Sequence, residues 1–418
     1  MRTKINALIQ AFKNHKKVIE NYFFMTVLQV LNSFFYLLIY PYLFRTIGSE
    51  SYGIFVFATS VSAYFSIIMK FGFDLPGVKA ISENRQDIRN MTEIISSVFT
   101  AKTYLFLILS PIFLVLLFVV PVFRDYKIVF IASFVMIYSQ VIFPQWFFQA
   151  IQAMRVVTFV QLGIKVLSLP LIFLFVKNAE DLDTYALIYS GSTLLGGLLA
   201  AFVMFKVYGI RLYWAATNKL KRWYQLGLPF FYTSLAASVK EYSIPIIVGS
   251  FFGMSEVAIY DLANKIISVP RILFVSINSA IFPKLIVNIK NNIVKKIIKA
   301  EIWLSIFTIL LIAVFGQWLV KMVSGICILD AYYLSLLLSV TILSWLVVGA
   351  YIYFVFMPNN KNYLVTQNQL VALISFFLFS LIGLAVYNNI LVFGAAMALS
   401  GLLEIVYCIW VTRKYKLL

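Results

Sequence analysis

The chain has 418 residues, of which 62% are hydrophobic and only 12% are charged. Soluble domains carry about twice that charged fraction, so this composition excludes an ordinary soluble protein. Apolar runs of about 20 residues, long enough for an α-helix to cross roughly 30 Å of hydrocarbon, recur along the whole chain. The composition therefore predicts an integral membrane protein.

We predict twelve transmembrane helices that follow one another with no soluble domain between them. In chain order they cover residues 21–44, 53–76, 101–122, 128–148, 158–177, 184–206, 228–250, 257–281, 302–321, 332–356, 364–386 and 390–411. The tail of residues 1–20 is basic and places Ile5, Leu8, Ile9 and Phe12 at helical spacing. This pattern predicts an amphipathic helix on the membrane surface rather than a cleaved signal peptide.

The formal net charge of +18 is explained by topology. Twelve helices place both termini on one side, and the opposite side carries only five basic residues, Arg45, Arg124, Lys127, Lys177 and Lys321. Because basic residues concentrate on the cytoplasmic side of membrane proteins, both termini are predicted to be cytoplasmic. A nucleic-acid partner is not expected. The basic residues on the predicted cytoplasmic side include Arg2, Lys4, Lys79, Lys102, Arg155, Lys206, Arg211, Lys284, Lys361 and Arg413.

The sequence also echoes itself at a shift of 205 residues. Gly48 then falls on Gly253 and Lys79 on Lys284, and the predicted helix boundaries follow the same shift. Two halves with an even number of helices form parallel repeats, related by an axis along the membrane normal. The predicted fold is thus an all-α integral membrane protein with two parallel six-helix lobes, residues 1–210 and 228–418, around a central cavity. The basic stretch 211–227 is predicted to be a cytoplasmic linker, either a solvated or interfacial connector or a regulatory binding segment.

Several kinds of chemistry have no sequence support. The stretch "GSTLLGG" (191–197) lacks the lysine of a phosphate-binding loop and favours close helix packing. The single histidine, His15, leaves no metal-ligand cluster and no Ser/His/Asp set. Cys327 and Cys408 fall on opposite sides of the membrane and cannot pair. We expect neither an enzyme nor a cofactor.

Charges inside predicted helices are the most informative feature, because each is costly in hydrocarbon unless it faces a cavity or a partner. Lys240 lies about 18 Å and Arg271 about 21 Å along their helices, near the midplane. Each could form a structural ion pair between helices or bind an anion in a water-filled cavity. The ionisable residues inside predicted helices are Lys70, Asp74, Lys165, Lys240, Glu241, Asp261, Lys265, Arg271 and Glu404.

Carboxylates accompany these cations. Glu241 is adjacent to Lys240 and therefore points about 100° away from it on the helix. The residues of two pairs, Asp261 with Lys265 and Lys70 with Asp74, are four positions apart, which suits local pairing. Glu404 is expected to pack against a neighbouring lysine. The candidates for ion coupling are Asp261, Glu241, Lys265 and Asp74. A cationic cavity in a membrane, without a nucleotide site, favours a transporter of an amphipathic anion.

The stretch "PQWFFQAIQAMRVVTFVQLGIKVL" (144–167) carries a family resemblance. It resembles the segment between helices four and five of Wzx-type O-antigen flippases, which belong to the multidrug, oligosaccharidyl-lipid and polysaccharide exporter superfamily. The matching positions are Trp146, Phe147, Phe148, Gln149, Arg155 and Lys165. Residues 73–87 and 175–185 resemble the same family, whereas Ala150 and Gln152 depart from its pattern. We interpret the three aromatic residues as an interfacial belt at the cytoplasmic end of helix four.

The resemblance implies a protein that alternates between inward-facing and outward-facing states in the bacterial inner membrane. Its substrate would be an undecaprenyl-pyrophosphate-linked oligosaccharide repeat, moved to the periplasmic leaflet. Lys240, Arg271 and Lys165, with Arg155 at the cytoplasmic rim, would bind the pyrophosphate. Membrane lipids, a glycan polymerase and a chain-length regulator would be partners. A proton, sodium or substrate gradient could supply the energy.

Alternatives remain open at this point. The substrate could be another lipid-linked glycan, such as a capsular or teichuronic repeat or lipid II, or a small cationic drug, although a drug exporter would favour an acidic cavity. A membrane glycan polymerase is the alternative from a different class, and the short predicted external loops count against it. Sugar recognition would use scattered cavity residues such as Gln140, Asn264, Asn278, Tyr351 and Gln367.

Overall fold

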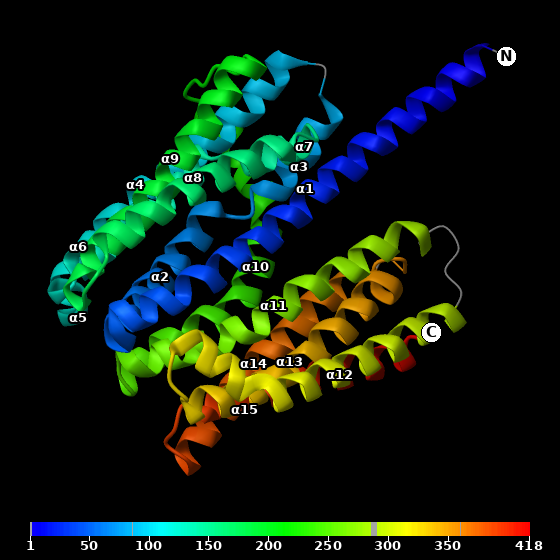
Figure 1. Cartoon of the computed structure of the whole chain (residues 1–418). Helices are drawn as coiled ribbons and strands as arrows, with labels where there is room; N and C mark the ends of the chain where they lie inside the picture. The colour runs from blue at the N-terminus through cyan, green and yellow to red at the C-terminus, as the bar shows by residue number, and fades with distance from the viewer. Residues whose placement is uncertain (1, 86, 286–290, 360) are drawn as a thin grey trace. The chain divides into compact units, whose positions relative to one another are not determined.

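A computed structural model of the chain is helical throughout its regular structure, and the described residues contain no strand (Figure 1). The structure describes residues 2–85, 87–285, 291–359 and 361–418. Within those ranges, the side chains of residues 2–19, 22, 33, 36, 37, 272, 273, 275–285, 291 and 362 lie outside the description. The predicted all-α fold is confirmed.

The chain forms two compact units. The first unit comprises Met1–Phe35 and Val61–Ser234, and the second comprises Tyr36–Ser60 and Leu235–Leu418. Helices α1 (Arg2–Thr46) and α2 (Gly48–Lys70) contribute to both units. The division into two six-helix lobes, 1–210 and 228–418, stays a prediction.

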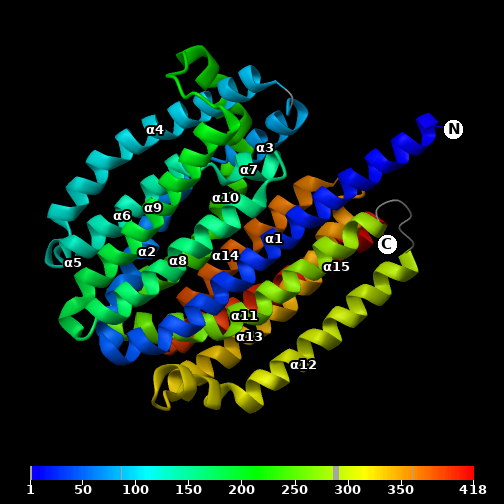
Figure 2. The same cartoon turned by 45° about the horizontal axis from the view of Figure 1, so that its top comes forward.

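The first unit is built mainly from long apolar helices. Helix α9 packs along both α6 and α8, and Figures 1 and 2 show α6 and α9 side by side. Helix α4 exposes an apolar face that includes Ile108, Val115 and Val119. Such a face suits contact with lipid. The unit contains α3 (Asp74–Glu83), α4 (Ile88–Val119), α5 (Pro121–Asp125), α6 (Lys127–Ile142), α7 (Gln145–Ala150), α8 (Met154–Phe175), η1 (Ala179–Asp181), α9 (Leu182–Tyr208) and the start of α10 (Thr217–Phe251).

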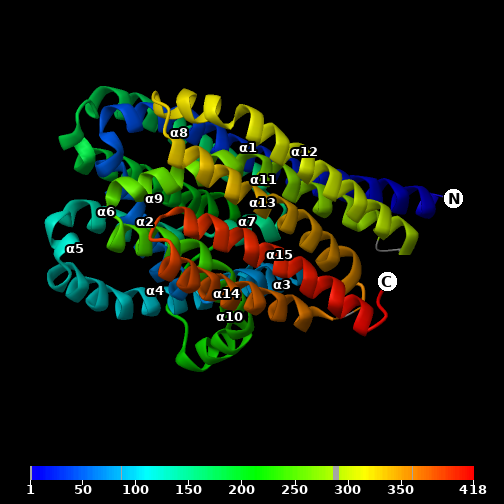
Figure 3. The ribbon, with the colours of Figure 1, turned by 90° about the horizontal axis from the view of Figure 1, so that it is seen from below.

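The second unit is organised around α13. This helix packs against α11, α12 and α15, as Figure 3 shows, and it is more buried than the candidate spans of α12, α14 and α15. It continues into a short π-helix. The π-helix is rare in proteins, and where it occurs it often lies at a functional site. The unit contains the rest of α10, α11 (Met254–Leu285), α12 (Asn291–Ser324), α13 (Leu329–Tyr351), η2 (Ile352–Phe356, the π-helix), α14 (Asn362–Val386) and α15 (Leu391–Lys414).

Nine helices within the described residues are long and apolar enough to cross a membrane. The other three predicted spans, 21–44, 228–250 and 257–281, lie within α1, α10 and α11. Two of these helices, α10 and α11, carry most of the intramembrane charges, which lower their mean hydropathy. The count of twelve therefore stays a prediction, whereas the multi-pass architecture is confirmed.

One predicted helix is broken. Instead of a single helix over 53–76, α2 ends at Lys70 and α3 begins at Asp74. Between them Phe71 and Gly72 adopt positive φ angles of 43° and 70°. A Cβ on Gly72 would lie 2.5 Å from the carbonyl oxygen of Gly227, so only glycine allows this approach. The break places Lys70 and Asp74 on different helices, so the predicted pair within one helix does not form. Asp74 forms its ion pair with Lys102 instead, while the charge of Lys70 still acts on it.

The interpretation of the aromatic run as an interfacial belt is also wrong. Trp146, Phe147 and Phe148 lie on the short helix α7 and are buried in the hydrophobic core of the first unit. The indole of Trp146 packs directly on Gly77 of α3, where a Cβ would lie 2.7 Å from the ring. The predicted span over 128–148 is interrupted before this run, between α6 and α7. The run therefore fastens α7 to α3.

Helix α1 is continuous from Arg2 to Thr46. The predicted surface helix over residues 1–20 is thus the first part of the same helix as the predicted first span. The side chains of Ile5, Leu8, Ile9 and Phe12, on which that prediction depends, lie outside the described residues.

Candidate functional site

The charged residues of α10 face two different helices. Lys240 Nζ donates a hydrogen bond to Glu404 Oε1 of α15 at 3.2 Å. Its neighbour Glu241 accepts a hydrogen bond at 3.1 Å from Nη1 of Arg271, which lies on α11. This divergence follows from the turn of about 100° between adjacent helical residues. One helix thereby anchors two ion pairs in the second unit.

Arg271 is held by a carboxylate and an aromatic ring together. Its guanidinium carbon lies 3.0 Å from the centroid of the Trp345 ring of α13. Its Nε is buried and has no hydrogen-bond partner among the described residues. A guanidinium presents donors in a rigid planar fork, which suits carboxylate and phosphate oxygens. Arg271 therefore retains an unused donor beside its existing ion pair.

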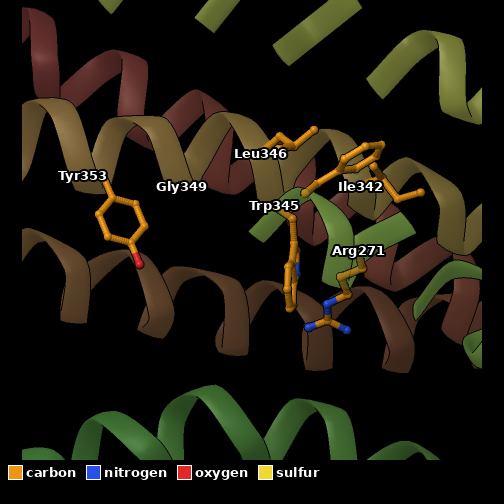
Figure 4. Close-up of a pocket in the computed structure, with 7 residues that line it drawn as sticks. Arg271, Ile342, Trp345, Leu346, Gly349 and Tyr353 are labelled. Atoms are coloured by element: carbon orange, nitrogen blue, oxygen red, sulfur yellow. The ribbon is translucent and has the colours of Figure 1, made fainter. Parts of the chain in front are cut away.

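A cavity of about 180 Å³ opens beside this guanidinium. In Figure 4, Trp345 and Tyr353 project from α13 and η2 towards the same side, and the guanidinium of Arg271 lies next to the indole. The cavity combines one cation with aromatic and apolar walls, a composition common in ligand sites. Its lining residues are Arg271, Phe274, Ile342, Trp345, Leu346, Gly349 and Tyr353.

The second ion pair is part of a buried polar network. Glu404 accepts a second hydrogen bond, at 3.3 Å, from Nδ2 of Asn368 on α14. The thiol of Cys408 lies 3.5 Å from Oδ1 of Asn368. Asn368 is fully buried, and the side chains of Lys240 and Glu404 are 17% and 11% exposed. This confirms the expected packing of Glu404 against a lysine. No pattern in the sequence indicates Asn368 as a partner of Glu404 or Trp345 as a partner of Arg271.

These contacts show whether Lys240 and Arg271 form structural ion pairs between helices. Both predicted midplane cations, Lys240 and Arg271, form ion pairs with carboxylates of other helices. The structural ion pairs considered from the sequence therefore exist. The anion-binding role of the same two cations stays a prediction.

Asp261 of α11 is the centre of a separate network. Its Oδ2 accepts a hydrogen bond of 2.8 Å from the Tyr52 hydroxyl of α2, and its Oδ1 lies 3.7 Å from Nζ of Lys265. The predicted pairing of Asp261 with Lys265 is confirmed. Nearby, the hydroxyl of Tyr40 donates to the carbonyl oxygen of Ala258. Asp261 thus joins the start of α2 to α11, and Ala258 joins the end of α1 to α11, within the second unit.

The same helix ends pack closely at two further points. Ser49 Oγ and Ser255 Oγ are 3.4 Å apart, and a Cβ on Gly53 would overlap the backbone of Met254. Both helices start at a left-handed glycine: Gly48 is the first residue of α2, and Gly253 directly precedes α11. These are the residues that the internal repeat aligns with each other.

Two predicted cationic residues lie in the first unit, on α8. Nζ of Lys165 is 4.7 Å from the ring centroid of Phe35, within the range of a cation–π interaction. Arg155 is exposed and lies 5.5 Å from the ring centroid of Phe159. The predicted path that joins these residues to Lys240 and Arg271 stays a prediction.

Asp74, also in the first unit, forms an ion pair with Lys102 of α4 at 2.8 Å. Lys102 is buried, whereas the side chain of Asp74 is 42% exposed. Burial raises the pKa of the Asp74 carboxyl, but the charge and hydrogen bond of Lys102, with the charge of Lys70, outweigh it and hold that pKa below its usual range. The carboxylate therefore remains charged in the folded protein.

The predicted sugar-contact residues are spread over the chain. Gln140 accepts a hydrogen bond from Ser66 in the first unit, and Gln367 accepts one from Tyr407 in the second. Asn264 and Tyr351 lie on α11 and α13, whereas the side chain of Asn278 lies outside the described residues. Among the described residues, no group of three His, Cys, Asp or Glu side chains could hold a metal ion.

Solved structures share this fold. The chain is similar to a structure titled "Lipid II flippase MurJ, inward closed conformation", with a TM-score of 0.70 and 13% identity over 94% of this chain and 86% of that one. It is also similar to an inward-facing multidrug resistance MATE family transporter of the MOP superfamily, with a TM-score of 0.61 and 14% identity over 91% of this chain and 98% of that one. These similarities confirm the fold that the family resemblance implies.

Sequence comparison identifies relatives and a family. A protein of Escherichia coli (strain K12) named "Putative O-antigen transporter" is 26% identical over 67% of each chain. A protein of the same name from Shigella dysenteriae is 23% identical over 64% of this chain and 67% of its own. The sequence profile of the family described as "Polysaccharide biosynthesis protein" matches residues 18–289. Because this match spans well over half of the chain, the protein belongs to the polysaccharide biosynthesis protein family.

Proposed function

We propose that this protein is a flippase that moves undecaprenyl-pyrophosphate-linked oligosaccharide repeat units from the cytoplasmic to the periplasmic leaflet. It would work by alternating access, without catalysing a reaction. The family match, the O-antigen transporter relatives and the flippase-like fold support a transporter of lipid-linked polysaccharide. The direction of transport and the exact substrate are the parts that we add.

The single observation that carries the proposal is Arg271 at the cavity. Its guanidinium stacks on Trp345, and its Nε is a buried donor without a partner in the described structure. A phosphate oxygen accepts strong charge-assisted hydrogen bonds from a guanidinium, especially where the dielectric constant is low. We propose that Arg271 and Lys240 bind the pyrophosphate while the polyprenyl tail remains in lipid.

Lys165 and Arg155 are proposed to assist earlier in the same process. Arg155 is exposed and begins α8, so it suits a first encounter with the headgroup. Lys165 lies about 15 Å further along this helix, from ten residues at about 1.5 Å each. Stacking on Phe35 compensates part of the cost of holding an ammonium within an apolar helix.

Ion coupling is proposed to involve Asp261 with Lys265, and Glu241 with Arg271. Asp261 joins helix ends through Tyr52, so a change in its charge would alter that junction. Asp261→Asn should abolish any dependence of transport on a proton or sodium gradient, and unchanged dependence would leave Asp261 as a structural partner. Asp74 is the weakest candidate, because its pairing with Lys102 already satisfies it.

The setting follows from the same proposal. The protein would reside in a bacterial inner membrane with both termini cytoplasmic. It would hand its substrate to a glycan polymerase, whose products a chain-length regulator would limit. Removal of the substrate by polymerisation would itself help to drive transport.

Complementation tests the function. The chain is returned to a host that lacks its own copy, and surface O-antigen is measured with lipid-linked repeats in the membrane. Arg271→Ala should abolish O-antigen and cause repeats to accumulate, whereas Arg222→Ala, at an exposed arginine of α10, should act as the wild type. Normal O-antigen in the Arg271→Ala strain, at equal protein level, would contradict the proposal. Rescue of a lipid II flippase defect instead would identify the alternative substrate.

A further inference from the structure

The charges around the proposed headgroup site cancel. Lys240 and Arg271 supply two cations, and Glu404 and Glu241 supply two carboxylates in direct contact with them. Arg271 also interacts electrostatically with Glu404, so the four groups form one cluster. A diphosphate that links a prenyl chain to a sugar carries about two negative charges. Its entry into a neutral cluster would place two uncompensated charges at low dielectric, which is costly.

We propose that Glu404 is a built-in competitor of the substrate headgroup, which displaces it from Lys240 and thereby causes it to bind a proton. This inference rests on the proposed function. In the exchange, Nζ of Lys240 stops donating to Glu404 Oε1 and donates to a phosphate oxygen instead. The proton comes from the acid form of the buffer in the surrounding solvent, reaches the site through water and adds to the displaced carboxylate. No other bond changes.

Glu404 and Glu241 differ in how far their side chains are exposed. The side chain of Glu404 is 11% exposed and lies between Lys240 and the buried Asn368. Once Lys240 turns to the substrate, this carboxylate has no aqueous surface to move to. The side chain of Glu241 is 41% exposed, so it can turn away from Arg271 to the outside of the packed cluster. The exchange therefore takes up one proton, at Glu404.

The surroundings of Glu404 contain few other ionisable groups. Lys240 faces it from α10, Arg271 acts on it from α11, and Cys408 lies one turn away on α15. Helix α14 contributes the neutral Asn368, and α13 presents Ser344 against Gly401, one turn before Glu404. Two cations favour the charged form of the carboxylate in the empty site. When a diphosphate neutralises them, the charged form of Glu404 loses that support.

Linkage fixes the sign of the pH dependence. If headgroup binding promotes proton binding, then protons promote headgroup binding by the same factor. Affinity for a prenyl diphosphate should therefore fall as the pH rises, until Glu404 can no longer be protonated in the complex. Glutamine at position 404 is neutral and cannot hold Lys240 by charge. Glu404→Gln should bind the headgroup at least about fivefold more tightly, and its affinity should lose this pH dependence.

Calorimetry with farnesyl-diphospho-N-acetylglucosamine, whose diphosphate is esterified at both ends and does not titrate near neutral pH, tests the inference on the purified full-length protein. Binding enthalpies at pH 7.5 in buffers of different ionisation enthalpy give the number of protons taken up. We expect about one proton for the wild type and about none for Glu404→Gln. Glu93→Gln is the matched control, because Glu93 pairs with Lys219 in an exposed ion pair of the first unit. It should retain the wild-type uptake.

The outcomes separate the two proposals. Binding of farnesyl-diphospho-N-acetylglucosamine to the wild type without proton uptake would overturn the role of Glu404 and leave the proposed function standing. Uptake that persists in Glu404→Gln would assign the proton to another group and also overturn it. Equal binding to the wild type and to Arg271→Ala would instead contradict the proposed headgroup site. The wild-type measurement needs no variant, so a variant that fails to fold does not prevent the test.

Discussion

Removal of Lys240 should lower the stability of the folded protein, because it leaves the buried carboxylate of Glu404 without its cation. In Lys240→Ala, Glu404 would retain only the hydrogen bond from Asn368, at 11% exposure. Breaking a buried pair by removing one partner costs about 3–5 kcal/mol. The upper part of this range applies at high pH, where the carboxyl must stay ionised. At low pH protonation limits the loss, so the deficit of the variant should shrink as the pH falls.

A double-mutant cycle measures this effect. The variants Lys240→Met, Glu404→Gln and the double variant are purified in detergent, and their thermal unfolding is followed at pH 6 and pH 8. The double variant should be more stable than Lys240→Met at pH 8, because it leaves no unpaired buried charge. A coupling of about 1–3 kcal/mol is expected for residues in contact. Additive losses in the two single variants would refute the reasoning, because the pair would then contribute nothing as a pair.

Three further predictions concern the contacts around the site. The native hydroxyl oxygens of Ser49 and Ser255 are 3.4 Å apart. The double variant Ser49→Cys with Ser255→Cys should therefore form a disulfide under oxidation and stop transport until the disulfide is reduced. Transport by the fully cross-linked protein would show that this junction does not open. Gly77→Leu should destabilise the first unit by about 1–3 kcal/mol, because its side chain would overlap Trp146. Gly163→Leu, at a position where a Cβ meets open space, should unfold at a temperature close to that of the wild type. Equal thermal stability of the two variants would argue against the packing of Trp146 on Gly77. The lowered pKa of Asp74 stabilises the fold above the unfolded-state pKa, and this contribution is lost as the pH falls through the folded-state pKa. Asp74→Asn should therefore be less stable than the wild type at pH 7 and nearly equal to it in acid. A constant difference in unfolding temperature between the two proteins across that pH range would contradict the pairing of Asp74 with Lys102.

The sequence predicted the fold well, because hydropathy and length determine which segments span a membrane. Each predicted span overlaps a helix of the structure, and most boundaries agree closely, as for α9 and α15. The errors occur where tertiary contacts override local pattern. The apolar run through Phe71 looked continuous, yet the close approach of Gly72 to Gly227 requires a left-handed bend there.

The sequence predicted the charged residues of the site better than it predicted the contacts between them. Charges at membrane depth are conspicuous in a sequence, so Lys240, Arg271 and Glu241 were found directly. Their partners depend on which helices lie side by side, which sequence periodicity does not reveal. Glu404 is 164 positions from Lys240, and Trp345 has no polar signal that distinguishes it from other apolar residues of α13. The aromatic run at 146–148 was visible, but burial against α3 rather than exposure to lipid decides its role.

Proteoliposomes test the central claim most directly. Purified protein is reconstituted with lipid-linked repeat units from its host, and the fraction that an added glycosidase can reach is followed over time. The wild type should carry the protected half of these lipids to the outer surface, whereas Arg271→Ala should leave them as protected as in liposomes without protein. Equal protection with and without the wild-type protein would contradict the claim that this chain is a flippase.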